Sequence, residues 1–309
     1  MRTIPGLALS VFLAVLLAVL LAIPMAAQTQ TPQQLADAAL KQKVVVCQTV
    51  TTQAQCHSKY VAGCGKTAGA KYDPYLDYFK NDLPGTDSQP AEKVDPAKLT
   101  QLEKNTPASL VEGNHNAFSK DFVKLNEGEI VEADGYLYYA ESTGAESSNC
   151  YVTGPSNVDI HIGIGFDATK VAEAKSKPAA QTPKFLDLQA HSMIVEMTPH
   201  YRAQKEPKWS LASLQAAYGL QVKVVGQLMA DNDHHKTADD CALSGAESSC
   251  WRLSIWEIHP VTAFYVCAAS KGCTSGSTTG WTKLEDWKPS SGGGGSKKKH
   301  PTKPHSPPA

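Results

Sequence analysis

The chain has 309 residues, of which 42% are hydrophobic, 19% charged and 7% aromatic. This composition is typical of a globular protein and excludes a wholly disordered, collagen-like or coiled-coil chain. The formal charge is −1, but four lysines lie in the last 13 residues, so residues 28–296 carry a net charge of −6. An acidic body argues against a dedicated duplex-DNA binder, whose phosphate contacts need a basic face.

The first 27 residues have the pattern of a secretory signal peptide. Arg2 precedes an apolar run from Leu7 to Ile23, which small residues up to Ala27 and the polar Gln28 follow. We therefore predict cleavage after Ala27 and a mature protein that is secreted or periplasmic. An uncleaved membrane anchor is the alternative, because the apolar run approaches the length of a span. After cleavage, no stable membrane span is expected.

Cysteines follow the leader in an even number, which predicts four disulfides in an exported chain. They are Cys47, Cys56, Cys64, Cys150, Cys241, Cys250, Cys267 and Cys273. Short loops favour the pairs Cys241 with Cys250 and Cys267 with Cys273, so the first four are left to pair among themselves. No C-x-x-C pair is present, which makes a structural zinc site the weaker interpretation.

Residues 28–124 are predicted to form a Cys/Pro-rich N-terminal arm. The segment from Cys47 to Cys64 is too poor in apolar residues to fold without disulfides. Five prolines fall between residues 73 and 107, and Lys98 to Lys104 forms at most a short helix. At the other end, residues 271–290 are a C-terminal extension, and the Gly/Lys/His/Pro-rich residues 291–309 are predicted to be a disordered tail.

Between these segments, residues 125–270 contain five stretches in which apolar and polar side chains alternate as in β-strands. The predicted strands span 129–139, 158–164, 193–197, 221–231 and 252–266, the last with a bend at His259-Pro260. A short helix is predicted between the third and fourth strands, with Ser210 as N-cap and Gly219 after its end.

Three strands, a helix and two strands form the element order of the five-stranded Greek-key barrel called the OB-fold. We therefore predict a mainly β protein with an OB-like barrel and an N-terminal extension that disulfides hold. Closing the barrel would remove the exposed edges of five short strands. A small β-sandwich or an irregular α+β sheet is the alternative.

Several short motifs in this region resemble a group of uncharacterised exported bacterial proteins with an OB-like domain. They are Gly135-Tyr136-Leu137, Glu146-Ser147-Ser148-Asn149-Cys150, Asp159-Ile160-His161, Val195-Glu196-Met197-Thr198-Pro199, Val225-Gly226-Gln227-Leu228-Met229 and Trp256-Glu257-Ile258-His259-Pro260-Val261. The resemblance covers about Leu125 to Val266. It implies the barrel and an exported location, and it brings no established activity with it.

Ionisable side chains gather on the second, third and fifth predicted strands, which are neighbours on the usual ligand-binding face of an OB barrel. They are Asp159, His161, Glu196, Glu257 and His259. Each is opposite in phase to the apolar side chains of its strand, so all five are expected to converge on the outer face of the barrel.

Three interpretations of this cluster are open. Imidazole and carboxylate ligands suit Zn²⁺ or another divalent ion that activates water, with His161, His259 and Glu196 as the metal ligands. A carboxylate beside a histidine could equally orient a general base. The third interpretation is a solvated polar face with cross-strand Glu–His and Asp–His pairs.

Aromatic side chains near the same face could stack on a sugar ring or a base. The loops before the second and fifth strands repeat the letters GAESS, at 144–148 and 245–249, and their hydroxyl groups could bind a sugar or a peptide. The predicted ligand-binding residues are Tyr136, Tyr138, Asp159, His161, Glu196, Trp251 and Glu257. Exposed tyrosines are also ordinary strand formers, which is the simpler interpretation of Tyr136 and Tyr138.

A second polar stretch, Asp231-Asn232-Asp233-His234-His235, begins like a calcium loop. It has Lys236 where an EF-hand needs Gly and Ala242 where it needs Glu, so the match fails. A turn rich in Asp and Asn is the default, and a metal site that uses His234 or His235 is the alternative.

From these patterns we predict an exported OB-like binding module without catalytic activity, whose ligand is an oligosaccharide, a peptide or a polyanion. It would require no cofactor. The alternative is a hydrolase that uses Zn²⁺ or another divalent metal at the Asp/His/Glu cluster. The expected partner is an exported ligand or an envelope component, and the basic tail would make weak, salt-sensitive contacts with polyanions.

Overall fold

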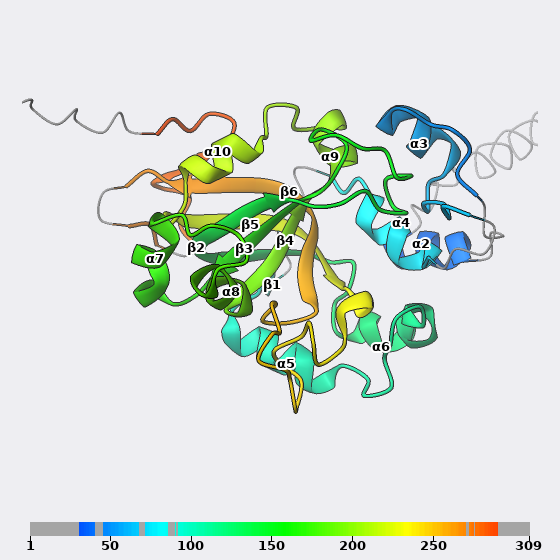
Figure 1. Cartoon of the computed structure of the whole chain (residues 1–309), viewed down its shortest axis with the longest axis horizontal. Helices are drawn as coiled ribbons and strands as arrows, with labels where there is room; N and C mark the ends of the chain where they lie inside the picture. The colour runs from blue at the N-terminus through cyan, green and yellow to red at the C-terminus, as the bar shows by residue number, and fades with distance from the viewer. Residues whose placement is uncertain are drawn as a thin grey trace, which may run out of the picture.

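Five strands close into a barrel at the centre of the molecule (Figure 1). The computed structural model describes residues 31–40, 46–67, 72–85, 90, 92–269, 272–274 and 276–289. The barrel strands are β2 (Ile130–Ser142), β3 (Ile160–Gly165), β4 (Ser192–Met197), β5 (Gln221–Ala230) and β6 (Trp256–Cys267). They pair in the order β2-β3-β4-β6-β5, and β5 returns to β2. Only β4 and β6 run parallel within this ring. The predicted OB-like barrel is confirmed.

Burial departs from strand alternation in the second half of β2, as it also does along β4, β5 and the first half of β6. In β2, the register against β3 shifts between Leu137 and Tyr139, so Leu137, Tyr138 and Tyr139 are all buried instead of alternating. Gly163 and Gly165 on β3 make room for the two tyrosine rings, because a Cβ atom at either glycine would overlap a ring. The rings of Tyr139 and Tyr138 therefore pack directly against the backbone of β3 at Gly163 and Gly165.

Short helices fill the connections between the strands. The helix predicted after Ser210 is α10 (Leu211–Ala216), and α9 (Pro199–Gln204) precedes it with Thr198 as N-cap. Between β3 and β4 lie η2 (Ala168–Lys170), α7 (Val171–Lys175) and α8 (Pro183–Ala190). The helices α7 and α8 pack beside β2 on one side of the barrel (Figure 1).

Residues before and after the barrel strands join the barrel core. Helix α5 (Pro96–Asn105) contributes Leu99 and Leu102, and Phe122 comes from α6 (Ser119–Lys124), which follows η1 (His115–Phe118). Strand β1 (Glu92–Lys93) pairs with β2, and β7 (Trp281–Lys283) pairs with β6. Part of the predicted N-terminal arm therefore packs against the barrel. This packing removes apolar surface of both the helices and the strands from water.

Three further helices, α2 (Pro32–Leu40), α3 (Gln53–Lys59) and α4 (Pro74–Asn81), lie together at one end of the barrel (Figure 1). Helix α4 begins at Asp73, whose carboxylate accepts the N–H groups of Tyr75 and Leu76, and Pro74 occupies its first turn. It buries Leu76 and Phe79. A proline-rich stretch thus contains a well-capped helix.

All eight cysteines form disulfides, as predicted. The pairs are Cys47–Cys64, Cys56–Cys150, Cys241–Cys250 and Cys267–Cys273. The second pair joins α3 to the loop before β3 and so ties the N-terminal helices to the barrel. Among the described residues, no helix has both the length and the apolar character that a membrane span needs. The predicted leader, 1–27, and the predicted tail, 291–309, lie outside the described residues.

Candidate functional site

The ionisable side chains of β3, β4 and β6 come together as their strand phases predict. His161 and Glu196 are paired residues across β3 and β4, and Nε2 of His161 lies 2.6 Å from Oε1 of Glu196. Nδ1 of His259 lies 3.0 Å from Oε1 of Glu257 and 3.6 Å from Oε2 of Glu196. Glu196 therefore stands between two imidazoles that belong to two different strands.

This cluster is buried, so its interpretation as a solvated polar face is wrong. Asp159, Glu196, Glu257 and His259 are each at most 2% exposed. The covering elements are helix α4 and the loop before β3. The side chain of Asn149 in that loop donates to Asp159 at 2.9 Å, and strand alternation gives no information about a helix that covers the outer face.

Two buried cations complete the cluster. Lys80 of α4 lies 3.2 Å from Asp231 and 3.5 Å from Glu146. Nη2 of Arg252 lies 2.6 Å from Oε2 of Glu257, and neither of these two side chains is exposed. A buried charge is costly unless it is paired, so these contacts are what allows the acidic groups to be buried.

Neighbouring charges shift the titration of the cluster. Burial alone would raise the pKa of Glu196, but the charges of His161 and His259 outweigh burial and hold it well below its usual range. Burial lowers and Glu196 raises the pKa of His161, with a net value of about 9. Burial, with the charges of Glu146 and Glu196, raises the pKa of Asp159 to about 7. The two histidines therefore favour the charged form of Glu196, and Glu196 favours theirs.

A compact set of metal-ligand atoms lies inside this cluster. One atom each of Asp159, Glu196 and His259 lies within 4.8 Å of the others. Nε2 of His259 and Oε2 of Glu196 have no hydrogen-bond partner among the described residues. Asp159, and not the predicted His161, completes this compact set. Since all three side chains are buried, a substrate has no direct access to an ion at this position.

His161 is the member of the cluster that reaches the surface, with a side chain that is 16% exposed. It lines a pocket of about 300 Å³ together with Glu141, Gln181, Leu186, Gln189, Ser249 and Trp251. The Trp251 ring stacks on the His161 ring, with centroids 6.4 Å apart and planes 16° apart. Gln189 donates to Glu141 at 3.1 Å. The pocket thus combines an aromatic wall with carboxylate and amide groups.

The two predicted tyrosines take no part in this pocket. Tyr138 is buried against α7 and α8, and its hydroxyl donates to the Asp167 carbonyl at 2.5 Å. Tyr136 packs against the same apolar cluster. The register shift in β2 turns Tyr138 inward, and the helices between β3 and β4 cover it. Neither feature is evident from strand alternation.

A second group of candidate metal ligands lies between α5 and the loop that joins β5 to β6. One atom each of Glu103, His235 and Asp240 lies within 4.8 Å of the others. The polar stretch that ends at His235 forms the expected turn, η3 (Asn232–His234), in which Asp231 accepts the N–H of Asp233. Burial, followed by the charge of Asp240, raises the pKa of Glu103 to about 7. The sequence indicated His235 but not Glu103, because the two residues meet only in the folded barrel.

Comparison with protein-family models, with curated proteins and with solved structures gives no match to this chain. The resemblance to exported bacterial proteins with an OB-like domain therefore stays a prediction. Any functional conclusion therefore rests on the geometry of the barrel and of the side chains described above.

Proposed function

We propose that this protein is an exported binding module that holds one ring of an oligosaccharide in the pocket that His161 and Trp251 line. The observation that carries the proposal is the combination of an indole ring with Glu141 and Gln189 around one open pocket. The pocket lies where β2 and β3 meet α8 and the loop before β6. This is the part of an OB barrel that ordinarily takes oligosaccharides and oligonucleotides.

The chemistry of the pocket favours a sugar over the other two ligand classes considered. An indole ring can pack against the apolar face of a sugar ring, and carboxylate and amide groups can bond its hydroxyls. A volume of about 300 Å³ is at the lower end for ligand pockets, which suits a single ring. A polyanion is disfavoured because Glu141 lines the pocket and Glu196 offsets the charge of His161.

The same residues favour binding over glycoside hydrolysis. Hydrolysis ordinarily requires two carboxyl groups, one on each side of the scissile bond. Glu141 is the single carboxylate among the described residues that line this pocket. A metal-dependent hydrolase at Asp159, Glu196 and His259 has less support, because those three side chains are buried beneath α4 and the loop before β3.

Calorimetric titration of the exported protein with chitotriose, cellotriose and maltotriose tests the proposal. We expect at least one of these trisaccharides to bind and Trp251→Ala to weaken that binding by about 10-fold or more, the equivalent of a stacking contact. Trp281→Ala, which alters a tryptophan of β7 outside the pocket, is the matched control. The proposal fails if none of the three sugars binds, or if the two tryptophan variants bind equally well.

A further inference from the structure

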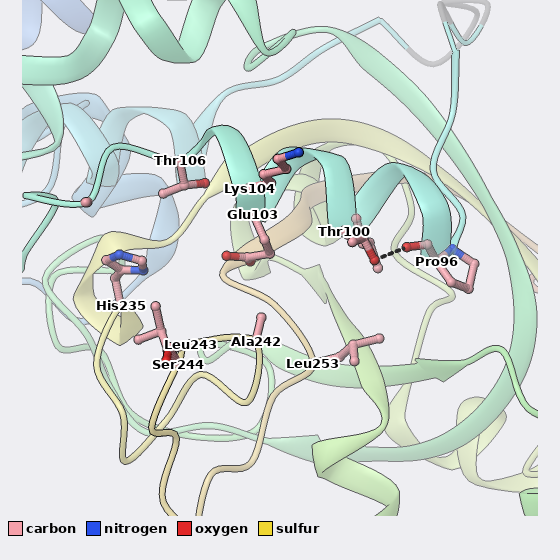
Figure 2. A pocket seen from close by; sticks show the side chains of 12 residues that line it. Pro96, Thr100, Glu103, Lys104, Thr106, His235, Ala242, Leu243, Ser244 and Leu253 are labelled. Carbon is pink, nitrogen blue, oxygen red and sulfur yellow. Dashed lines mark hydrogen bonds between the residues drawn. The ribbon is translucent and has the colours of Figure 1, made fainter.

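A further pocket lies between α5 and the loop that follows η3. Its volume is about 690 Å³. Figure 2 shows Glu103 leaving α5 toward the loop that carries His235, Ala242 and Leu243. Leu99 and Leu253 form an apolar part of the wall. The pocket therefore combines apolar walls with an acid and an imidazole.

Two atoms at this pocket are buried and have no hydrogen-bond partner among the described residues. They are Nδ1 of His235 and Oδ2 of Asp240, which face each other at 3.6 Å. The Asp240 side chain has no exposed area, and that of His235 is 8% exposed. The two atoms lie within ion-pair distance but make no hydrogen bond, and buried polar atoms are normally bonded, so both can take a further partner.

The remaining contacts hold these side chains in place. Oδ1 of Asp240 accepts the N–H of Ala242 at 2.9 Å, which leaves Oδ2 for another partner. Oε1 of Glu103 accepts the N–H of Ile255 at 2.9 Å and also the hydroxyl of Ser254. The disulfide between Cys241 and Cys250 fixes the loop next to Asp240. The carboxylates of Glu103 and Asp240 are thus positioned by a second set of bonds, as metal ligands usually are.

The charges of Glu103 and Asp240 also favour a bound cation. Two carboxylates face one imidazole within 4.8 Å. Lys104 is the other ionisable group that lines the pocket, but it extends from the opposite side of α5 in Figure 2, away from Glu103. A positive ion between the two carboxylates would remove their mutual repulsion and supply the missing partner of Asp240.

We propose that Glu103, His235 and Asp240 bind one divalent transition-metal ion, Zn²⁺ foremost, in the wall of this pocket. Zn²⁺ takes nitrogen and carboxylate ligands at roughly 2.0 to 2.2 Å, so donors this close together need only small side-chain adjustments to share an ion. Three protein ligands leave a four-coordinate zinc one position for water or for an oxygen of a ligand. The site would then be an accessible Lewis acid, independent of the sugar pocket.

Calorimetric titration of the full exported chain with Zn²⁺, without an affinity tag, tests the proposal. We expect one tight site per chain, and Co²⁺ at the same site should give the visible absorption of a low-coordinate ion. Glu103→Gln, His235→Gln and Asp240→Asn should each weaken Zn²⁺ binding by about 100-fold or more, since loss of a direct ligand exceeds the usual effect of a supporting residue. His300 and His305 of the tail are present in every variant, so their contribution cancels.

Two matched variants separate this site from the alternatives. Lys104→Ala changes the same pocket without removing a donor atom, and Asp159→Asn changes the buried cluster under α4; both should bind Zn²⁺ like the original protein. Circular dichroism and the melting temperature identify any variant that fails to fold, and His235→Gln is the most informative variant because Nδ1 of His235 makes no hydrogen bond among the described residues that the substitution would break. The proposal is overturned if the original protein has no stoichiometric Zn²⁺ site, or if Asp159→Asn removes the site and His235→Gln does not.

Discussion

His161 and Glu196 face each other across β3 and β4, with 2.6 Å between the imidazole nitrogen and the carboxylate oxygen. The pKa of His161 is about 9 in the fold against an ordinary 6.5, so protonation of His161 stabilises the fold fully below pH 6.5. This stabilisation is lost as the pH rises through 9. The raised pKa of Asp159, about 7, acts in the same direction at lower pH. We expect the melting temperature to fall between pH 6.5 and 9.

His161→Gln checks the assignment of this pH dependence, because glutamine can still donate to Glu196 but does not titrate. The variant should show a flatter decline between pH 6.5 and 9. His191→Gln removes a half-exposed histidine and should leave the profile unchanged. Parallel profiles for the original protein and His161→Gln would contradict the prediction. Glu196 predicts a second change at acid pH. Because its pKa is lowered in the fold, its charged form stabilises the protein above about pH 4.5, and this stabilisation is lost as the pH falls below that value.

Lys80→Met should destabilise the protein strongly. The substitution leaves the carboxylate of Asp231, which is 1% exposed, without its closest cation. Breaking a buried ion pair in this way costs about 3 to 5 kcal/mol, which urea unfolding can measure. Lys124→Met is the matched control, because its pair with Asp121 is exposed and should contribute less than about 1 kcal/mol. Similar losses in the two variants would argue against an energetic role for the buried pair.

The disulfides should differ in their contribution to stability. Cys56–Cys150 closes a loop of 94 residues in sequence separation, whereas Cys241–Cys250 spans 9. Restriction of the unfolded chain predicts about 4 to 5 kcal/mol for the long loop and about 2 to 3 kcal/mol for the short one. Double serine variants of each pair, compared by urea unfolding, check this order. A larger loss for the short loop would show that native contacts, and not loop length, dominate.

Alanine at Gly163 or Gly165 should destabilise the barrel. A Cβ atom at these positions would overlap the rings of Tyr139 and Tyr138, and such overpacking costs about 1 to 3 kcal/mol or more. Gly144→Ala is the control, since a Cβ there meets no atom of the described chain within 4 Å and its effect should stay within about 0.5 kcal/mol. Equal stability of all three variants would mean that β3 can shift away from the tyrosines.

The barrel could be predicted because its interior has a period of two in the sequence. Ile160, Ile162 and Ile164 alternate along β3, and all three are buried in the core. The same period placed His161 opposite to them, and that is why its contact with Glu196 could be expected. Alternation fixes the face on which a side chain lies, so it brings side chains on neighbouring strands together.

The cover over this face could not be predicted from the same pattern. Helix α4 supplies Lys80, and its start signal is Asp73 before Pro74, in a stretch that the other prolines make look extended. Arg252, the first residue of the predicted fifth strand, lies four residues before β6 and meets Glu257 because the chain bends between them. Glu103 depends on a contact between α5 and a distant loop. The alternation of apolar and polar residues reports only on neighbouring positions in the chain. The places of Lys80, Arg252 and Glu103 depend instead on how separate segments pack against one another.

Strand β6 closes the barrel, and it is also the last of the five barrel strands to be synthesised. Strand β6 is the only one of the five that connects the edge of β4 to the edge of β5. It also carries His259, the second histidine beside Glu196. A chain that ends before Trp256 therefore lacks the strand that closes the barrel, and with it the partners that Arg252 and Glu196 find in Glu257 and His259.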